Sequence, residues 1–128
     1  MHDLIIIGGG PSGVSAAIFA ALSGLKPIIW DFKSGVIDKA CGEGLMPAAI
    51  KKLEQMGVEI KSSHPFYGIR YIDQSKMAEA DFSQGPGKGV RRLELHKALV
   101  QRAKDLGVRW EKRKATKITP LQDHVQVD

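Results

Sequence analysis

The sequence predicts an α/β domain whose parallel sheet begins with a strand–helix–strand unit. Three observations predict it: an apolar run at Leu4–Ile7, a glycine-rich turn at Gly8–Gly13, and a second apolar run that ends at Asp31. Apolar runs that do not alternate are typical of strands covered on both faces, and a glycine-rich turn suits the passage from strand to helix. We therefore expect two parallel strands, at 3–7 and 28–31, of which the first is buried on both faces.

The other elements follow from local signals. The helix between the two strands, over 11–24, is rich in small side chains and ends at Gly24. A short helix begins at Pro47 and ends near Gly57, after a loop over 32–46. We further expect antiparallel strands at 66–73 and 76–82, a loop at 83–89 too rich in glycine for regular structure, an amphipathic helix at 92–106, a third strand at 108–111, and a hairpin that pairs 115–119 with 124–127.

The glycine-rich turn has the composition of a dinucleotide-binding turn. Gly8 permits a tight turn after the strand, Gly10 lets a pyrophosphate approach the backbone, and Gly13 lets the helix pack closely on the strand. The helix N-terminus directs N–H groups and partial positive charge at the phosphates, and Ser12 adds a hydroxyl donor. The alternative is an ordinary glycine-rich turn.

Asp31 follows the turn at about the distance expected for a ribose-binding acid. Its carboxylate can accept hydrogen bonds from the ribose hydroxyls of adenosine, and it would repel a 2′-phosphate, which argues against NADP at this site. The alternative is a surface acid at a strand end. The long interval from Asp31 to Val108, with an inserted segment at about 58–89, favours FAD over NAD because extra structure beside the cofactor suits a bulky isoalloxazine ring.

Two further segments, Asp38–Pro47 and Gly89–Val100, resemble FAD-dependent oxidoreductases of the geranylgeranyl reductase and p-hydroxybenzoate hydroxylase type, to which flavin-dependent monooxygenases and halogenases are related. The resemblance implies a Rossmann-like FAD-binding domain with a parallel sheet and an antiparallel insertion or meander. It places Arg92, rather than Arg91, near the ribityl or phosphate region of FAD. It gives no role to His96, where the family often has an acid.

The resemblance also lays the backbone around Thr116 against adenine. The complete set of expected cofactor-binding residues is Gly8, Gly10, Pro11, Ser12, Gly13, Asp31, Phe32, Cys41, Gly42, Arg92 and Thr116. For Cys41, a small residue packed in the cofactor loop is favoured over a redox thiol or a covalent flavin anchor. Glu43 is expected to brace the loop rather than to act as an acid near the ring. No catalytic residue can be named.

Family members are several hundred residues long and carry a later glycine-rich segment and a substrate-binding sheet. We therefore expect residues 1–128 to form the N-terminal portion of an FAD-binding domain, truncated and without its substrate domain. The isolated chain should bind FAD weakly or not at all and should lack catalysis; the longer relatives would take hydride from NAD(P)H or another donor and act on a small-molecule substrate. The alternative is a non-enzymatic nucleotide-binding module, or a subunit completed by a partner chain.

Composition limits the classes of partner, location and metal site that we expect. The net charge is +5 and the basic residues concentrate after Lys88, but no nucleic-acid motif accompanies them, so we expect no nucleic-acid partner. We expect no membrane span and no signal peptide. The single cysteine, Cys41, fits a reducing compartment, and the cytoplasm is the expected location. The histidines lack ligand spacing, so no metal site is expected.

Overall fold

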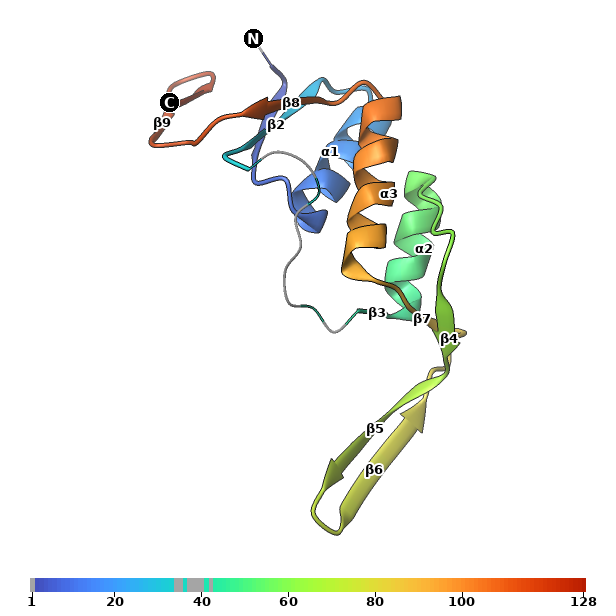
Figure 1. Ribbon diagram of the computed structural model, residues 1–128. Helices are drawn as coiled ribbons and strands as arrows, with labels where there is room; N and C mark the ends of the chain where they lie inside the picture. Colours follow the sequence, from blue (N-terminus) through green and yellow to red (C-terminus); the bar gives the residue numbers. More distant parts are fainter. Residues whose placement is uncertain (1, 34–35, 37–40, 42) are drawn as a thin grey trace.

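The computed structural model describes residues 2–33, 36, 41 and 43–128. In this part of the chain the helices are α1 (Pro11–Leu22), α2 (Pro47–Met56) and α3 (Arg92–Asp105). The strands are β1 (Leu4–Ile7), β2 (Pro27–Asp31), β3 (Gly44–Leu45), β4 (His64–Phe66), β5 (Gly68–Asp73), β6 (Lys76–Asp81), β7 (Gly87–Gly89), β8 (Arg109–Lys112), β9 (Ile118–Pro120) and β10 (Val125–Val127). They form an α/β body from which two hairpins project (Figure 1).

The parallel sheet has the order β1-β2-β8, with Ile29 of β2 paired to Ile6 of β1 and to Trp110 of β8. All five residues of β2 are buried. The burial on both faces that was expected for the first apolar run is wrong, since Ile7 is 50% exposed. The physical reason is position: within the described residues β1 pairs only with β2 and forms an edge of the sheet.

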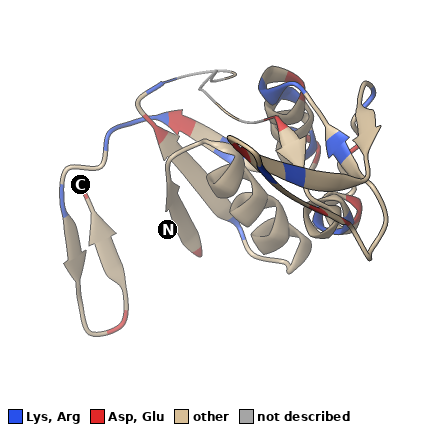
Figure 2. Cartoon of the chain, turned by 90° about the horizontal axis from the view of Figure 1, so that it is seen from below, with Lys and Arg blue, Asp and Glu red and all other residues tan. Residues whose placement is uncertain are grey.

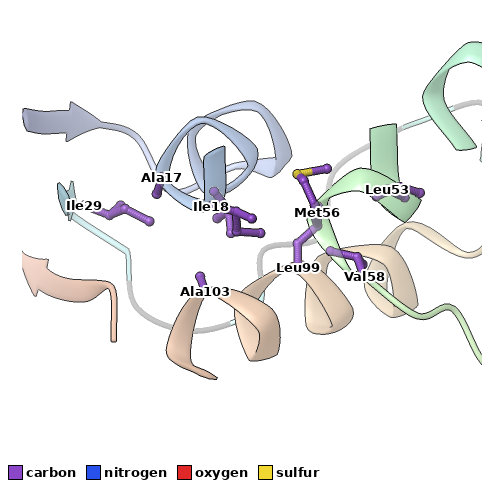
Figure 3. Packing of buried hydrophobic residues seen from close by; sticks show 9 residues of the cluster. Ala17, Ile18, Ile29, Leu53, Met56, Val58, Leu99 and Ala103 are labelled. Atoms are coloured by element: carbon purple, nitrogen blue, oxygen red, sulfur yellow. The ribbon is translucent and has the colours of Figure 1, made fainter. Parts of the chain in front are cut away.

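The core lies between the parallel sheet and the helices. Ile18 of α1 and Ile29 of β2 lie near Leu99 and Ala103 of α3, and α2 packs beside them (Figure 3). The small side chains of α1, such as Ala17, let α3 approach closely. The buried cluster contains Val14, Ala17, Ile18, Ile29, Leu53, Met56, Val58, Leu99 and Ala103. This packing fixes α3 against α1, and therefore fixes both helices relative to the turn after β1.

The segment expected to be an irregular loop at 83–89 contains a strand instead. β7 is the centre of a small antiparallel sheet of order β3-β7-β4, in which Gly87 pairs with Phe66. A Cβ on Gly87 would lie 2.4 Å from Phe66 Cζ, so the absence of a side chain makes room for the aromatic ring. The prediction was wrong because pairing with neighbouring strands overrides the low strand propensity of glycine.

Both expected hairpins are present, with shorter strands than predicted. β5 and β6 pair antiparallel from Gly68↔Asp81 to Asp73↔Lys76 and extend away from the body (Figure 1). β9 and β10 pair from Pro120↔Val125 to Ile118↔Val127. Figure 2 shows a basic stretch at the end of β8 and the start of the connection to this C-terminal hairpin, formed by residues 112–114.

Candidate functional site

Parallel pairing brings the carboxyl ends of the strands to one edge of the sheet. Ile7 is opposite Trp30, and Asp31 is opposite Lys112, so the turn after β1 and the acid that ends β2 are neighbours. Ligands of open α/β sheets bind at the carboxyl ends of the strands. The candidate site is therefore built from the glycine turn, Asp31 and the helix termini that face this edge.

Each predicted glycine of the turn has its own geometry. Gly8 has a φ of +104°, a conformation that L side chains rarely adopt, and its N–H donates to the carbonyl of Trp30 at 2.8 Å. A Cβ on Gly13 would lie 1.9 Å from the carbonyl oxygen of Gly8, so α1 can leave the strand this steeply only with glycine there. A Cβ on Gly10 would meet nothing within 4 Å, so this side of the turn faces open space.

The turn leads directly into the N-terminus of α1. Gly10 is the N-cap with extended backbone, Pro11 is the first helical residue, and Ser12 is exposed in the first turn. The N-cap makes no side-chain hydrogen bond, and the first turn carries no acidic residue. The N–H groups and partial positive charge of this helix end are thus available to an anion.

Asp31 is tied to the glycine turn by a direct hydrogen bond. The N–H of Gly9 donates to Asp31 Oδ2 at 2.7 Å, and the N–H of Lys33 donates to Asp31 Oδ1 at 2.8 Å. The carboxylate is only 8% exposed, so both bonds hold it in a fixed orientation. Each carboxylate oxygen has a second acceptor position, and the group can therefore still receive hydroxyl donors.

Gly9 and His96 were absent from the predicted set, and the structure joins them. The side chain of His96 is fully buried, and its Nε2 lies 2.7 Å from the carbonyl oxygen of Gly9. A Cβ on Gly9 would lie 2.0 Å from Trp110 Cζ2, so the turn packs directly on that indole. A signal for His96 existed in the sequence: it shares a helix face with Leu99 and Ala103, where an apolar residue is expected.

Arg92 is the first residue of α3, one helical turn before His96. Its backbone N–H donates to Glu43 Oε1 at 3.1 Å, and its Nε is buried without a hydrogen-bond partner among the described residues. Glu43 itself has a φ of +53°, and its carbonyl accepts from the N–H of Val90 at 2.7 Å. Glu43 therefore ties its loop to the start of α3, which agrees with the expected bracing role.

The other predicted residues lie around this site or away from it. Phe32 follows Asp31 directly and is largely exposed, and Cys41 is an exposed free thiol. Thr116 donates from its backbone N–H and its hydroxyl to the carbonyl of Asp128, beside the C-terminal hairpin. Gly42 lies outside the described residues. The structure thus joins the glycine turn and Asp31 directly and links them to α3 through His96.

The comparison with known families shows the family to which the chain belongs. The sequence model of the FAD binding domain family matches residues 3–125, nearly the whole chain. The chain belongs to the FAD binding domain family. The predicted fold class and the cofactor FAD are confirmed by this membership and by the parallel sheet.

Individual relatives of this FAD binding domain are flavoproteins and reductases. Menaquinone reductase of Mycobacterium tuberculosis is 34% identical over 114 residues, covering 84% of this chain and 28% of the relative. Digeranylgeranylglycerophospholipid reductase 1 of Methanothermobacter thermautotrophicus is 41% identical over 58 residues, covering 44% of this chain and 14% of the relative. The crystal structure of a flavoprotein/dehydrogenase from Cytophaga hutchinsonii superposes with a TM-score of 0.75 at 27% identity, covering 93% of this chain and 32% of that one.

The likeness to reductases of the geranylgeranyl type is therefore confirmed. The chain spans 28% of the length of the menaquinone reductase that it matches. Among the described residues, none of the helices combines the length and the apolar character that crossing a bilayer requires. The described residues also hold no cluster of three or more metal-ligating side chains.

The residues of the FAD binding domain fit the group that the family implies. The open side of Gly10 leaves room for a pyrophosphate against bare backbone, and the uncapped N-terminus of α1 offers it N–H donors. The Nε of Arg92 is a buried donor without a protein partner in the described part of the chain. A buried donor of this kind is expected to have an acceptor, and an oxygen-rich ligand supplies one.

Proposed function

We propose that the glycine turn, Asp31 and the first turn of α3 hold FAD, in a longer protein that uses the flavin to move electrons between a donor and a substrate. The observation that carries the proposal is the hydrogen bond from the Gly9 N–H to Asp31 Oδ2, beside the open face of Gly10. It fixes a ribose-binding carboxylate and a phosphate-binding turn relative to each other. That pairing is what a dinucleotide requires.

Each residue then has a defined task. The backbone at Gly8, Gly10 and Gly13 and the hydroxyl of Ser12 receive the pyrophosphate, while Pro11 presets the first turn of α1. Asp31 accepts from the hydroxyls of the adenosine ribose. We assign to Arg92 the ribityl or phosphate oxygens, because among the buried donors without a partner in the described residues, which also include the indole N–H groups of Trp30 and Trp110, it is the cationic one.

The remaining predicted residues complete the proposed site at its two ends. Phe32 follows the ribose-binding acid, and we propose that Thr116 lies toward the adenine and Cys41 toward the flavin. When bound, FAD supplies transfer of one or two electrons through its isoalloxazine ring. The protein's part is to bind and orient the cofactor, and Glu43 serves this by holding the start of α3.

For the whole protein we propose a reductase that takes hydride from NAD(P)H or another donor and reduces an unsaturated substrate. Two of the relatives are named as reductases, of menaquinone and of digeranylgeranylglycerophospholipid, which supports reduction over hydroxylation or halogenation. The chain covers 28% of the first of these, so we propose that the isolated chain binds cofactor without turnover. The substrate-binding residues would lie in the remainder of the longer protein.

A subunit completed by a partner chain is the alternative function. The outer edge of β1 supports it, because within the described residues β1 pairs only with β2 and Ile7 is half exposed. Such an edge can accept a further strand. Copurification of a second polypeptide in stoichiometric amount would favour this alternative.

The proposal is tested by titrating the purified chain with FAD and following backbone amides by NMR, which detects weak binding. We expect the amides of Gly8–Gly10, Ser12, Gly13 and Asp31 to shift together, and a Gly10→Ala variant to lose most of the response while keeping its melting temperature. A Gly85→Ala variant in the loop between β6 and β7 is the control for FAD binding alone, since its φ of +96° makes an alanine strained there. FAD-induced shifts that avoid the glycine turn would overturn the proposal.

A further inference from the structure

The pyrophosphate turn contains Gly8, Gly9 and Gly10 in succession, the most flexible backbone that three residues can form. Such a turn loses a large conformational entropy when it closes on a ligand, unless the protein fixes it in advance. In this chain the turn is fixed by three contacts. All three are made by Gly9, which is buried in the middle of the turn.

The first restraint is the bond from the Gly9 N–H to Asp31 Oδ2 at 2.7 Å, and the second is Trp110, whose ring leaves no room for a side chain on Gly9. The third comes from α3, where His96 Nε2 lies 2.7 Å from the Gly9 carbonyl oxygen. A carbonyl oxygen only accepts hydrogen bonds, so the imidazole carries a proton on Nε2 and donates it. His96 is fully buried, and its helix is anchored to α1 through the core.

Fixing the Gly9 carbonyl also fixes a group on the ligand side. The carbonyl of Gly9 and the N–H of Gly10 belong to one planar trans peptide, in which they point in opposite directions. With the carbonyl held by His96, the Gly10 N–H is directed away from α3, at the start of α1 and on the residue whose Cβ position is open. This N–H is one of the donors that the proposed pyrophosphate site requires.

We infer that His96 is a positioning residue for the dinucleotide: through the Gly9 carbonyl it holds the Gly10 N–H in the direction that a pyrophosphate needs. The inference rests on the proposed FAD site and extends it to a residue on α3 that does not itself touch the ligand. It distinguishes His96 from Arg92 one turn earlier, whose unpartnered Nε is assigned to the ligand directly.

The test uses three variants of the full chain. His96→Leu removes the donor with little change in volume, and His96→Gln keeps an N–H donor at the ε position. His64→Leu, an exposed histidine on β4, is the matched control. Amide hydrogen exchange reports the turn without any ligand, and binding of ADP and of adenosine separates the phosphate contribution from that of the nucleoside.

In the wild-type chain we expect a proton on Nε2 of His96, read from its ring nitrogen shifts, and a protected Gly9 amide. His96→Leu should speed exchange at Gly9 about tenfold more than at the core amides of Ile18 and Leu99, and His96→Gln should restore most of the protection. ADP affinity should fall about tenfold in His96→Leu, as expected for one lost buried hydrogen bond, while adenosine affinity stays close to that of the wild type.

Equal acceleration at Gly9 and at the core amides would show that His96 only packs α3 on α1 and would overturn the inference. A wild-type Nδ1–H tautomer would overturn it as well, and that measurement needs no variant that folds. Failure of the wild-type chain to bind ADP or FAD would instead count against the proposed function. The exchange measurement and the tautomer would then still decide whether His96 holds the turn.

Discussion

The α/β body and the β5–β6 hairpin are built from strands of similar length but with opposite surroundings. Every residue of β2 is buried, whereas every residue of β6 is exposed. The body gains stability from apolar packing between sheet and helices, and the hairpin has only its backbone pairing and cross-strand side-chain contacts. A lone two-stranded hairpin is marginal in water. The proposed FAD site therefore lies on the part of the chain whose own packing can hold its geometry.

The difference in stability between the body and the hairpin is tested most strongly by replacing one isoleucine in each region. Ile18→Ala deletes a fully buried side chain between α1 and α3, and we expect it to lower the free energy of unfolding by about 3 kcal/mol. Ile72→Ala in the hairpin removes a side chain that is 69% exposed, and we expect a change within about 0.5 kcal/mol. Urea denaturation followed by circular dichroism measures both, and equal losses would contradict the division into two regions.

A second pair of variants separates stability from binding inside the body itself. Gly13→Ala places a Cβ against the Gly8 carbonyl oxygen, and we expect it to destabilise the chain by about 2 kcal/mol because backbone must shift. Gly10→Ala meets open space, so the melting temperature should change little while FAD binding is lost. Thermal denaturation and FAD titration of both variants check this; a destabilised Gly10→Ala chain would count against the open face.

Asp31→Asn should weaken both the hydrogen bonds of residue 31 to the backbone and its binding of the ribose. Asparagine keeps one acceptor oxygen, so one of the two backbone N–H groups now bound to Asp31 loses its partner, and we expect a loss of about 1 kcal/mol in stability. Affinity for FAD should fall about tenfold. Asp73→Asn at the tip of the hairpin is the control, and a similar loss of affinity there would place the ribose elsewhere.

The smallest effect is expected in the hairpin. Arg70 and Glu79 form an ion pair across β5 and β6 in which both side chains are more than half exposed. Removing it by Glu79→Ala should lower stability by less than about 0.5 kcal/mol, because solvent screens exposed pairs. Chemical denaturation tests this. A loss above about 1 kcal/mol would show that the hairpin folds cooperatively with the body.

Much of the fold could be predicted because local signals and tertiary structure agree. The glycine turn, the acid that ends β2 and the helix over 92–105 are each marked by a few adjacent residues. The burial of β1 was predicted wrongly, because an apolar run does not reveal whether its strand lies at the centre or the edge of a sheet. The strand β7 was missed because the need for glycine at its first residue, Gly87, is explained only by the ring of Phe66, which lies elsewhere in the sequence.

The candidate site likewise contains residues that the sequence predicts and residues that it does not. Gly8, Gly10, Gly13 and Asp31 follow a spacing that can be read along the chain, and the structure brings them together. Gly9 and His96 act through a contact between residues far apart in sequence, which no spacing rule describes. The position of His96 on an apolar helix face is the one sequence signal that indicates a special role for it. That signal does not predict which residue His96 contacts.

We propose above all that the glycine turn and Asp31 bind the nucleotide half of FAD. The most direct measurement is an amide NMR titration of the chain with FAD up to millimolar concentration. We expect the amide signals of Gly8–Gly10, Ser12, Gly13 and Asp31 to shift on one binding curve. ADP should reproduce these shifts, and the amide signals of β5 and β6 should stay unchanged. Shifts confined to the hairpins, or an undisturbed turn at saturating FAD, would contradict it.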